Sequence, residues 1–89
     1  MWIEKVTDKL SEIYGEDKAG QVSMNIMPSC IADFSKMLEK AAPGDNVNET
    51  YRTEDGLAEL FFTGIKTDSV SILKFVDVNG QRVTAEVEL

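Results

Sequence analysis

The main change in the spacing of the apolar residues along this chain falls at Ala42-Pro43-Gly44-Asp45. Before this point apolar residues recur mostly every three or four positions, as in amphipathic helices; after it they recur mostly at every second position, as in strands. Pro and Gly together end a helix, so the two halves cannot belong to one continuous element. The pattern therefore predicts an α+β fold in which two helices pack on one face of an antiparallel sheet.

Two helices are expected in the first half. The first lies in residues 1–14, where Ile3, Val6, Leu10 and Ile13 follow a 3-4-3 spacing, and Gly15 supplies its stop. The second follows Ser29, a favourable N-cap, and runs to residue 41, with apolar and charged residues on opposite faces.

The connection between these helices is less sharply defined by the sequence. Residues 15–20 are polar and predict a loop. In residues 21–27, Val22, Met24 and Ile26 alternate with polar residues, which favours a short half-buried strand ended by Pro28. A loop or a helical turn is the alternative, because Met is not a strong strand former.

The second half predicts a three- to four-stranded antiparallel meander, and residues 1–89 are expected to form a single domain. The expected strands are residues 46–53, weak and polar; 57–65, central and covered on both faces; and 70–78 and 81–89, which form a hairpin.

The turn Asn79-Gly80 is a strong hairpin signal, and a two-residue loop places Asp77 opposite Arg82. Strict alternation then divides the last two strands between two faces. One face holds Val70, Ile72, Val76, Val78, Val83, Ala85, Val87 and Leu89, and is expected under the helices. On the other face, Leu73 and Phe75 are expected to join Leu60 and Phe62 in an apolar strip.

The composition excludes several kinds of chemistry. Sixteen acidic residues against nine basic ones give a net charge of −7, which disfavours direct binding to nucleic acid. The absence of His removes the usual general base and the Ser-His-Asp arrangement. One Cys cannot form a zinc site, and no phosphate-binding glycine motif is present. We therefore expect neither an enzyme nor a bound cofactor; a site made of carboxylates alone is the remaining catalytic alternative.

Cellular location is indicated only indirectly. No stretch approaches the roughly 18 apolar residues that cross a membrane, and charges follow Met1 too soon for a signal peptide. A single cysteine suits a reducing compartment, so a cytoplasmic protein with no membrane contact is expected. Cys30 is either reactive, with its thiol pKa lowered at the first turn of the second helix, or a small buried residue.

Acidic residues gather in two places. Residues 45–59, hereafter the acidic segment, hold five acids against Arg52 alone and include Tyr51; the acidic ridge is a column of three acids on the first helix. The segment is either an edge strand protected against aggregation or a docking surface for a basic protein. The candidate partner-binding residues are Asp45, Glu49, Tyr51, Glu54, Asp55, Glu59, Glu4, Asp8 and Glu12.

These observations favour a small acidic binding protein that occupies a basic surface on another protein, as inhibitors, immunity proteins and nucleic-acid mimics do. That comparison depends on size and charge alone. The alternative is a structural or accessory subunit that self-associates, for example as a homodimer, through the apolar face of its sheet.

Overall fold

A computed structural model describes all residues, 1–89, and its first half is an antiparallel pair of helices. Helix α1 spans Trp2–Tyr14 and helix α2 spans Glu16–Lys40. The first helix and its stop are confirmed, because Gly15 alone separates the two helices. Gly15 has φ 83° and ψ 159°, a backbone conformation that is essentially restricted to glycine.

Helix α2 is longer than its sequence pattern indicates. The loop expected at residues 15–20 and the strand expected at 21–27 are wrong, and Ser29 is not an N-cap, since residues 16–29 all lie within this helix. Pro28 is exposed and is accommodated inside the helix. The buried stripe of α2 consists of Ala19, Ser23, Met27, Cys30, Phe34 and Leu38.

One residue of that buried stripe, Ser23, is polar, and it interrupts the apolar spacing by which a helix is recognised in the sequence. Ser23 is buried against α1, where the hydroxyl of Thr7 lies 2.7 Å from its Oγ. Met24, which resembled an inward strand residue, is instead 79% exposed. Tertiary contact with α1 therefore decides the structure of this stretch.

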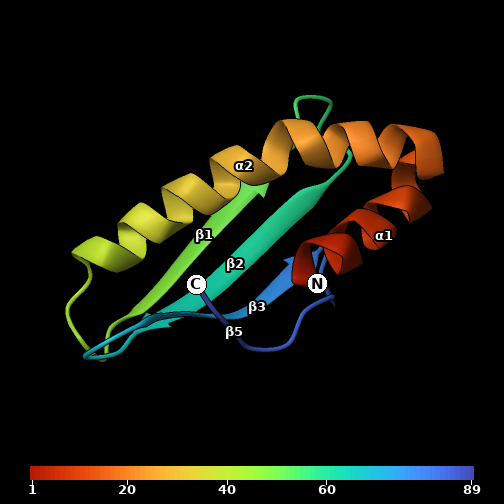
Figure 1. Ribbon diagram of the computed structural model, residues 1–89. Coiled ribbons are helices and arrows are strands. Elements are labelled where there is room, and N and C mark those ends of the chain that lie inside the picture. Colours follow the sequence, from red (N-terminus) through yellow and green to blue (C-terminus); the bar gives the residue numbers. More distant parts are fainter.

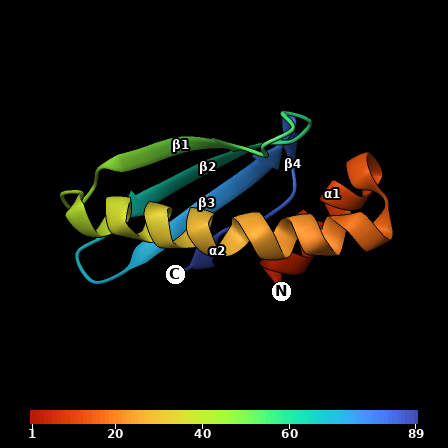
Figure 2. The ribbon, with the colours of Figure 1, turned by 90° about the horizontal axis from the view of Figure 1, so that it is seen from above.

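The second half forms one five-stranded antiparallel sheet, in which β1 to β4 follow one another in order and β5 pairs with β3. The strands are β1 (Asn46–Arg52), β2 (Glu59–Lys66), β3 (Ser71–Val78), β4 (Gln81–Arg82) and β5 (Val87–Glu88). Both helices lie on the same side of the sheet, with α2 running along it and α1 packed nearer β3 (Figures 1 and 2). The predicted α+β architecture and the helix stop at residues 42–45 are confirmed.

A bulge between β2 and β3 changes which residues face the helices. Thr63 pairs with Phe75 but Gly64 pairs with Leu73, so Lys74 is an additional residue in β3. The inward side of β3 therefore changes parity at this point. Leu73, not Ile72, shares the helix-covered face with Val76 and Val78.

The apolar strip expected opposite the helices is wrong in three of its four members. Only Leu73 is turned inward by the bulge; Leu60 and Phe62 pair directly with the inward Val78 and Val76. Leu60, Phe62 and Leu73 belong to the buried core. The outward apolar residues, all half-buried, are Phe61, Ile65, Ile72 and Phe75. The expectation that β2 is covered by elements on both faces is also wrong, because both helices lie on one side (Figure 2).

The hairpin register is confirmed. Asn79 and Gly80 have φ 49° and 82°, as a type I′ turn requires, and Arg82 pairs with Asp77. The single strand expected over residues 81–89 is interrupted after Arg82. There the buried Thr84 hydroxyl accepts a 2.9 Å hydrogen bond from the Val76 amide, in place of a backbone partner.

Strand pairing resumes one residue out of the hairpin register, with Val87 opposite Leu73. Ala85 and Leu89, expected on the covered face, are exposed. No helix of this fold is both long and apolar enough to cross a membrane.

Candidate functional site

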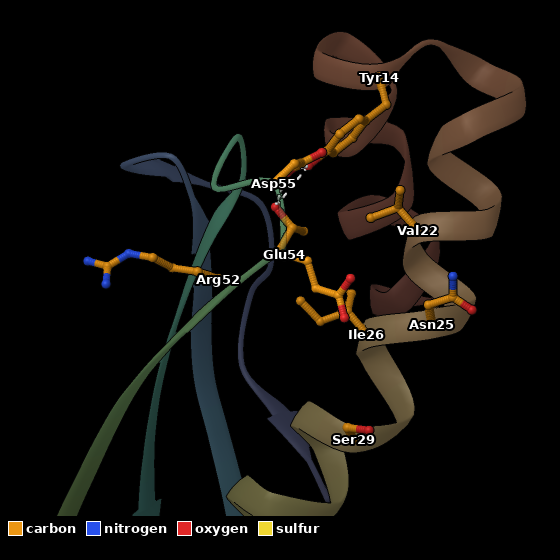
Figure 3. A pocket seen from close by; sticks show the side chains of 9 residues that line it. Tyr14, Val22, Asn25, Ile26, Ser29, Arg52, Glu54 and Asp55 are labelled. Atoms are coloured by element: carbon orange, nitrogen blue, oxygen red, sulfur yellow. Dashed lines mark hydrogen bonds between the residues drawn. The ribbon is translucent and has the colours of Figure 1, made fainter.

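An open groove of about 500 Å³ lies between α2 and the turn that follows β1. Val22 and Ile26, one helical turn apart on α2, supply its apolar side, and Ser29 continues the same face of the helix (Figure 3). The opposite side consists of residues 52–55. The groove thus joins two parts of the chain that are about thirty residues apart.

One end of the groove is closed by Tyr14 and Asp55. The Tyr14 hydroxyl donates a 2.7 Å hydrogen bond to Asp55 Oδ1, which also accepts from the Thr53 hydroxyl and the Leu57 amide at 2.7 and 3.0 Å. These bonds, that of the Leu57 amide above all, lower the pKa of the Asp55 carboxyl. Lys18, whose Nζ lies 5.5 Å from the Tyr14 ring centroid, adds a positive charge nearby.

A second tyrosine–aspartate contact lies just beyond the other end. The Tyr51 hydroxyl donates a 2.6 Å hydrogen bond to Asp33 Oδ2, joining β1 to α2. Asp33 follows Ser29 by about one helical turn, and Tyr51 precedes Arg52 directly. Burial first, and then the Asp33 carboxylate, raise the pKa of Tyr51 far above its ordinary value.

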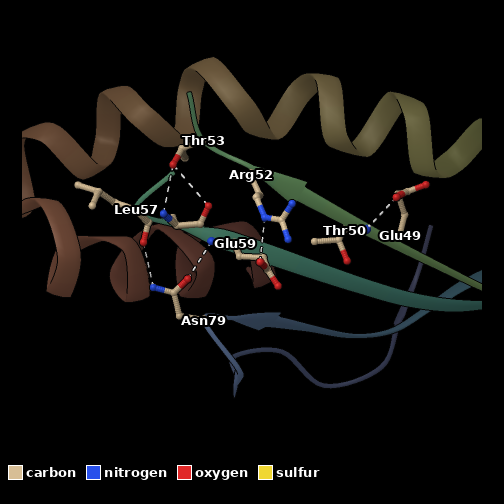
Figure 4. Close-up of polar contacts among 8 residues, drawn as sticks. Glu49, Thr50, Arg52, Thr53, Leu57, Glu59 and Asn79 are labelled. Atoms are coloured by element: carbon tan, nitrogen blue, oxygen red, sulfur yellow. Dashed lines mark hydrogen bonds and ion pairs between the residues drawn. The ribbon is translucent and has the colours of Figure 1, made fainter. Parts of the chain in front are cut away.

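Glu54 is the unpaired charge of the groove. It is exposed, no hydrogen bond or ion pair engages its carboxylate, and its side chain projects toward Ile26 (Figure 3). Arg52 points away from the groove, and its Nε donates to Glu59 Oε2 at 2.9 Å (Figures 3 and 4). The groove therefore combines an apolar side with a free carboxylate, and Arg52, the one basic residue of its lining, is directed away to Glu59.

The turn that carries Glu54 is held by a residue of the distant hairpin. The Asn79 side chain donates to the Leu57 carbonyl at 3.1 Å and accepts from the Glu59 amide at 2.8 Å (Figure 4). The Thr53 hydroxyl also accepts a 3.2 Å bond from the Ala58 amide. Contacts on both sides thus fix the turn.

The other acids of the segment have separate roles. Glu49 lies on the helix-facing side of β1, and its Oε1 accepts a 2.9 Å bond from the Thr50 amide (Figure 4). Asp45 is exposed in the turn before β1, and no side-chain bond engages it. Of the five acids in the segment, only Asp45 and Glu54 are unpaired.

The acidic ridge lies on the exposed side of α1. Glu4 is 3.8 Å from the N-terminal amine, and Glu12 pairs with Lys9 at 2.9 Å, while Asp8 has no ion-pair partner. No hydrogen bond or ion pair links Glu4, Asp8 or Glu12 to the acidic segment. The two acidic groups remain two separate surfaces.

Sequence reasoning missed the groove residues Tyr14, Val22, Ile26 and Thr53, and the supporting residues Asp33 and Asn79. A helical reading of residues 16–28 would have placed Val22, Ile26, Ser29 and Asp33 on one face, at spacings of four, three and four. No sequence pattern marks Asn79 as a side-chain partner of residues 57–59.

Cys30 lies in the middle of α2, away from any helix terminus, so the expectation of a first-turn cysteine is wrong. It is 2% exposed, and burial raises the pKa of its thiol to about 11. This arrangement is typical of a small packed residue. No three Cys, Asp or Glu side chains gather so that they could hold a metal ion.

Comparisons of this chain with protein-family models, with curated proteins and with solved structures found no match.

Proposed function

We propose that this protein is a small acidic intracellular binding protein that docks its acidic segment onto a basic surface of a partner protein. The observation that carries the proposal is the free Glu54 carboxylate, presented on a fixed turn beside an open groove. The single buried cysteine is consistent with an intracellular location.

The rigid turn favours binding. Asp55 and Asn79 hold residues 53–59 through side-chain bonds, so little conformational freedom remains to be lost when a partner binds. A net charge of −7 would attract a basic surface over a distance of about a Debye length, roughly 8–10 Å at physiological salt. In this proposal the segment makes the contact, and the ridge of Glu4, Asp8 and Glu12 contributes to attraction.

A catalytic role has less support. The tyrosines and the cysteine with perturbed pKa values all have raised values, which keeps them protonated at neutral pH and makes them poor nucleophiles. The pKa of the Asp55 carboxyl is lowered, which makes this carboxylate a weak base.

The test compares two double variants after affinity capture has identified a partner from native lysate. Asp45→Lys with Glu54→Lys changes only unpaired acids of the segment. Glu86→Lys with Glu88→Lys makes the same change in net charge at exposed positions outside both acidic surfaces. Asp55 is left intact because it fastens the turn to α1.

We expect the first variant to associate more slowly with the purified partner, and the wild-type rate to fall steeply with salt. The control should retain most of the wild-type rate. Both variants should remain folded, because exposed charges contribute little to stability. Equal association rates for the two variants would contradict the proposal.

The second candidate is self-association through the uncovered sheet face. Phe61 and Phe75 lie there with ring centroids 6.3 Å apart, and the Arg82 guanidinium stacks 3.5 Å from the Phe75 centroid. Sedimentation equilibrium would favour this candidate if a dimer persisted at high salt and Phe61→Ser dissociated it. A monomer at all accessible concentrations would contradict it.

A further inference from the structure

We propose that the groove between α2 and residues 52–55 receives an apolar side chain from a partner segment, and that a neighbouring lysine or arginine of that segment pairs with Glu54. This inference depends on the proposed function and specifies which part of the acidic segment recognises the partner. It rests on the shape, lining and charge of the groove.

The groove is held open by bonds on either side of it. The Tyr14–Asp55 bond fastens α1 to the turn, and the Tyr51–Asp33 bond fastens β1 to α2. Together these two bonds tie α1, β1, α2 and the turn to one another, so the groove is part of the folded protein before a partner arrives. Its volume of about 500 Å³ falls within the usual range for small binding sites, roughly 300–1,000 Å³.

The lining indicates the chemistry of the occupant. Val22 and Ile26 are only partly buried although both contact the core, so each offers apolar surface that an incoming side chain could cover. Glu54 extends toward the same helix face, and Arg52 is directed away to Glu59 (Figure 3). An apolar group with a nearby positive charge therefore complements both features.

Other occupants fit less well. A phosphate or another anion would be repelled by the carboxylates of Glu54 and Asp55, and Arg52, the basic residue of the lining, is already paired with Glu59. A small polyamine would satisfy the carboxylates but leave the Val22 and Ile26 surface uncovered. A protein segment with an apolar residue beside a basic one satisfies both parts of the groove.

The test is a titration of the full-length protein, followed by amide chemical shifts. The probe is a short blocked peptide containing Lys-Leu-Lys; Lys-Ser-Lys and Glu-Leu-Glu versions and spermidine serve as comparisons. We expect saturable shifts at Val22, Ile26 and Glu54 with the Lys-Leu-Lys peptide. The serine peptide and spermidine should bind weakly, and the glutamate peptide should not bind.

Two matched pairs of variants test the named contacts. Glu54→Gln should weaken Lys-Leu-Lys binding by about two- to five-fold. Glu86→Gln is its control, because it also removes one exposed charge but lies outside the groove, and it should leave binding unchanged. Ile26→Ala should weaken it by on the order of ten-fold, whereas Ile31→Ala, at a half-buried position of α2 outside the groove, should leave it unchanged. Unfolding curves for each pair would exclude loss of structure as the cause.

Three outcomes would overturn the inference: equal binding of the serine peptide, reproduction of the groove shifts by spermidine, or Lys-Leu-Lys shifts confined to the acidic ridge. None of them decides the proposed function, because a short peptide tests only the groove, whereas the contact made by the acidic segment is tested with the captured partner. The proposed function fails separately, if the charge-reversed segment retains the wild-type association rate with the captured partner.

Discussion

The hydroxyl of Tyr51 donates a 2.6 Å hydrogen bond to the Asp33 carboxylate and so joins the edge strand β1 to the middle of α2. The Tyr51 ring also packs edge-on against Phe62, with centroids 5.3 Å apart, so the hydroxyl is held in position by the core. One residue thus combines core packing with a polar link at the margin of the groove.

Removing the Tyr51 hydroxyl should destabilise the protein. We expect Tyr51→Phe to lower the free energy of unfolding by about 0.5–1.5 kcal/mol, because the ring remains and only the hydrogen bond is lost. A double-mutant cycle with Asp33→Ala, measured by urea denaturation, separates this bond from other effects. A coupling energy near zero would show that the contact adds no stability.

Stability should decrease at alkaline pH. Burial raises the pKa values of Tyr51 and Cys30 above their ordinary values of 10.0 and 9.0. The folded state therefore favours the protonated forms of both side chains. Their contribution to the free energy of unfolding is fully present at pH values below the ordinary pKa values, and it is lost as the pH rises above about 9. Urea denaturation at increasing pH should show the decline, and Tyr51→Phe should decline less steeply than wild type. Parallel curves would contradict the role of Tyr51.

Gly64 should tolerate no side chain. A Cβ there would lie 2.8 Å from the Ile72 carbonyl oxygen and 2.9 Å from Cε2 of the Phe34 ring. Gly64→Ala should therefore cost about 1–3 kcal/mol. Gly20→Ala is the matched control: it meets no atom within 4 Å inside α2, and helix propensity should make it stabilising by about 0.5–1 kcal/mol. Thermal unfolding of the two variants should shift in opposite directions.

Two buried threonines should respond differently to the same substitution. Thr84→Val removes the acceptor of the Val76 amide and leaves a buried N–H without a partner, at a cost of about 1–3 kcal/mol. Thr63 Oγ1 is buried and has no hydrogen-bond partner, so Thr63→Val should be neutral or stabilising. Denaturation midpoints test this contrast; equal losses would contradict it.

Cys30 should react slowly with thiol reagents. It is 2% exposed and its pKa is raised to about 11, so little thiolate is present and access is blocked at neutral pH. Iodoacetamide labelling followed by mass spectrometry should be much slower in buffer than in urea. Rapid labelling of the folded protein would revive the reactive interpretation.

Several features follow from local sequence alone. Ala42-Pro43-Gly44-Asp45 ends α2, because proline and glycine disrupt a helix wherever they occur together. Asn79-Gly80 determines a type I′ turn, because both residues tolerate positive φ, and the Asp77–Arg82 register follows directly. These signals act over a few residues, so no knowledge of the rest of the fold is needed to interpret them.

Other features were decided only by tertiary structure. Ser23 lies in a buried helical stripe because Thr7 of another helix supplies its partner, and Lys74 reverses the faces of β3 through a bulge that alternation does not indicate. The groove likewise requires Tyr14, Val22 and Glu54 from separate parts of the chain. Local periodicity determined the kind of element outside residues 15–29 and 83–86. Contacts between distant residues determined the helix at residues 16–29, which side chains are buried and which meet at the groove, because burial depends on the neighbours that packing supplies.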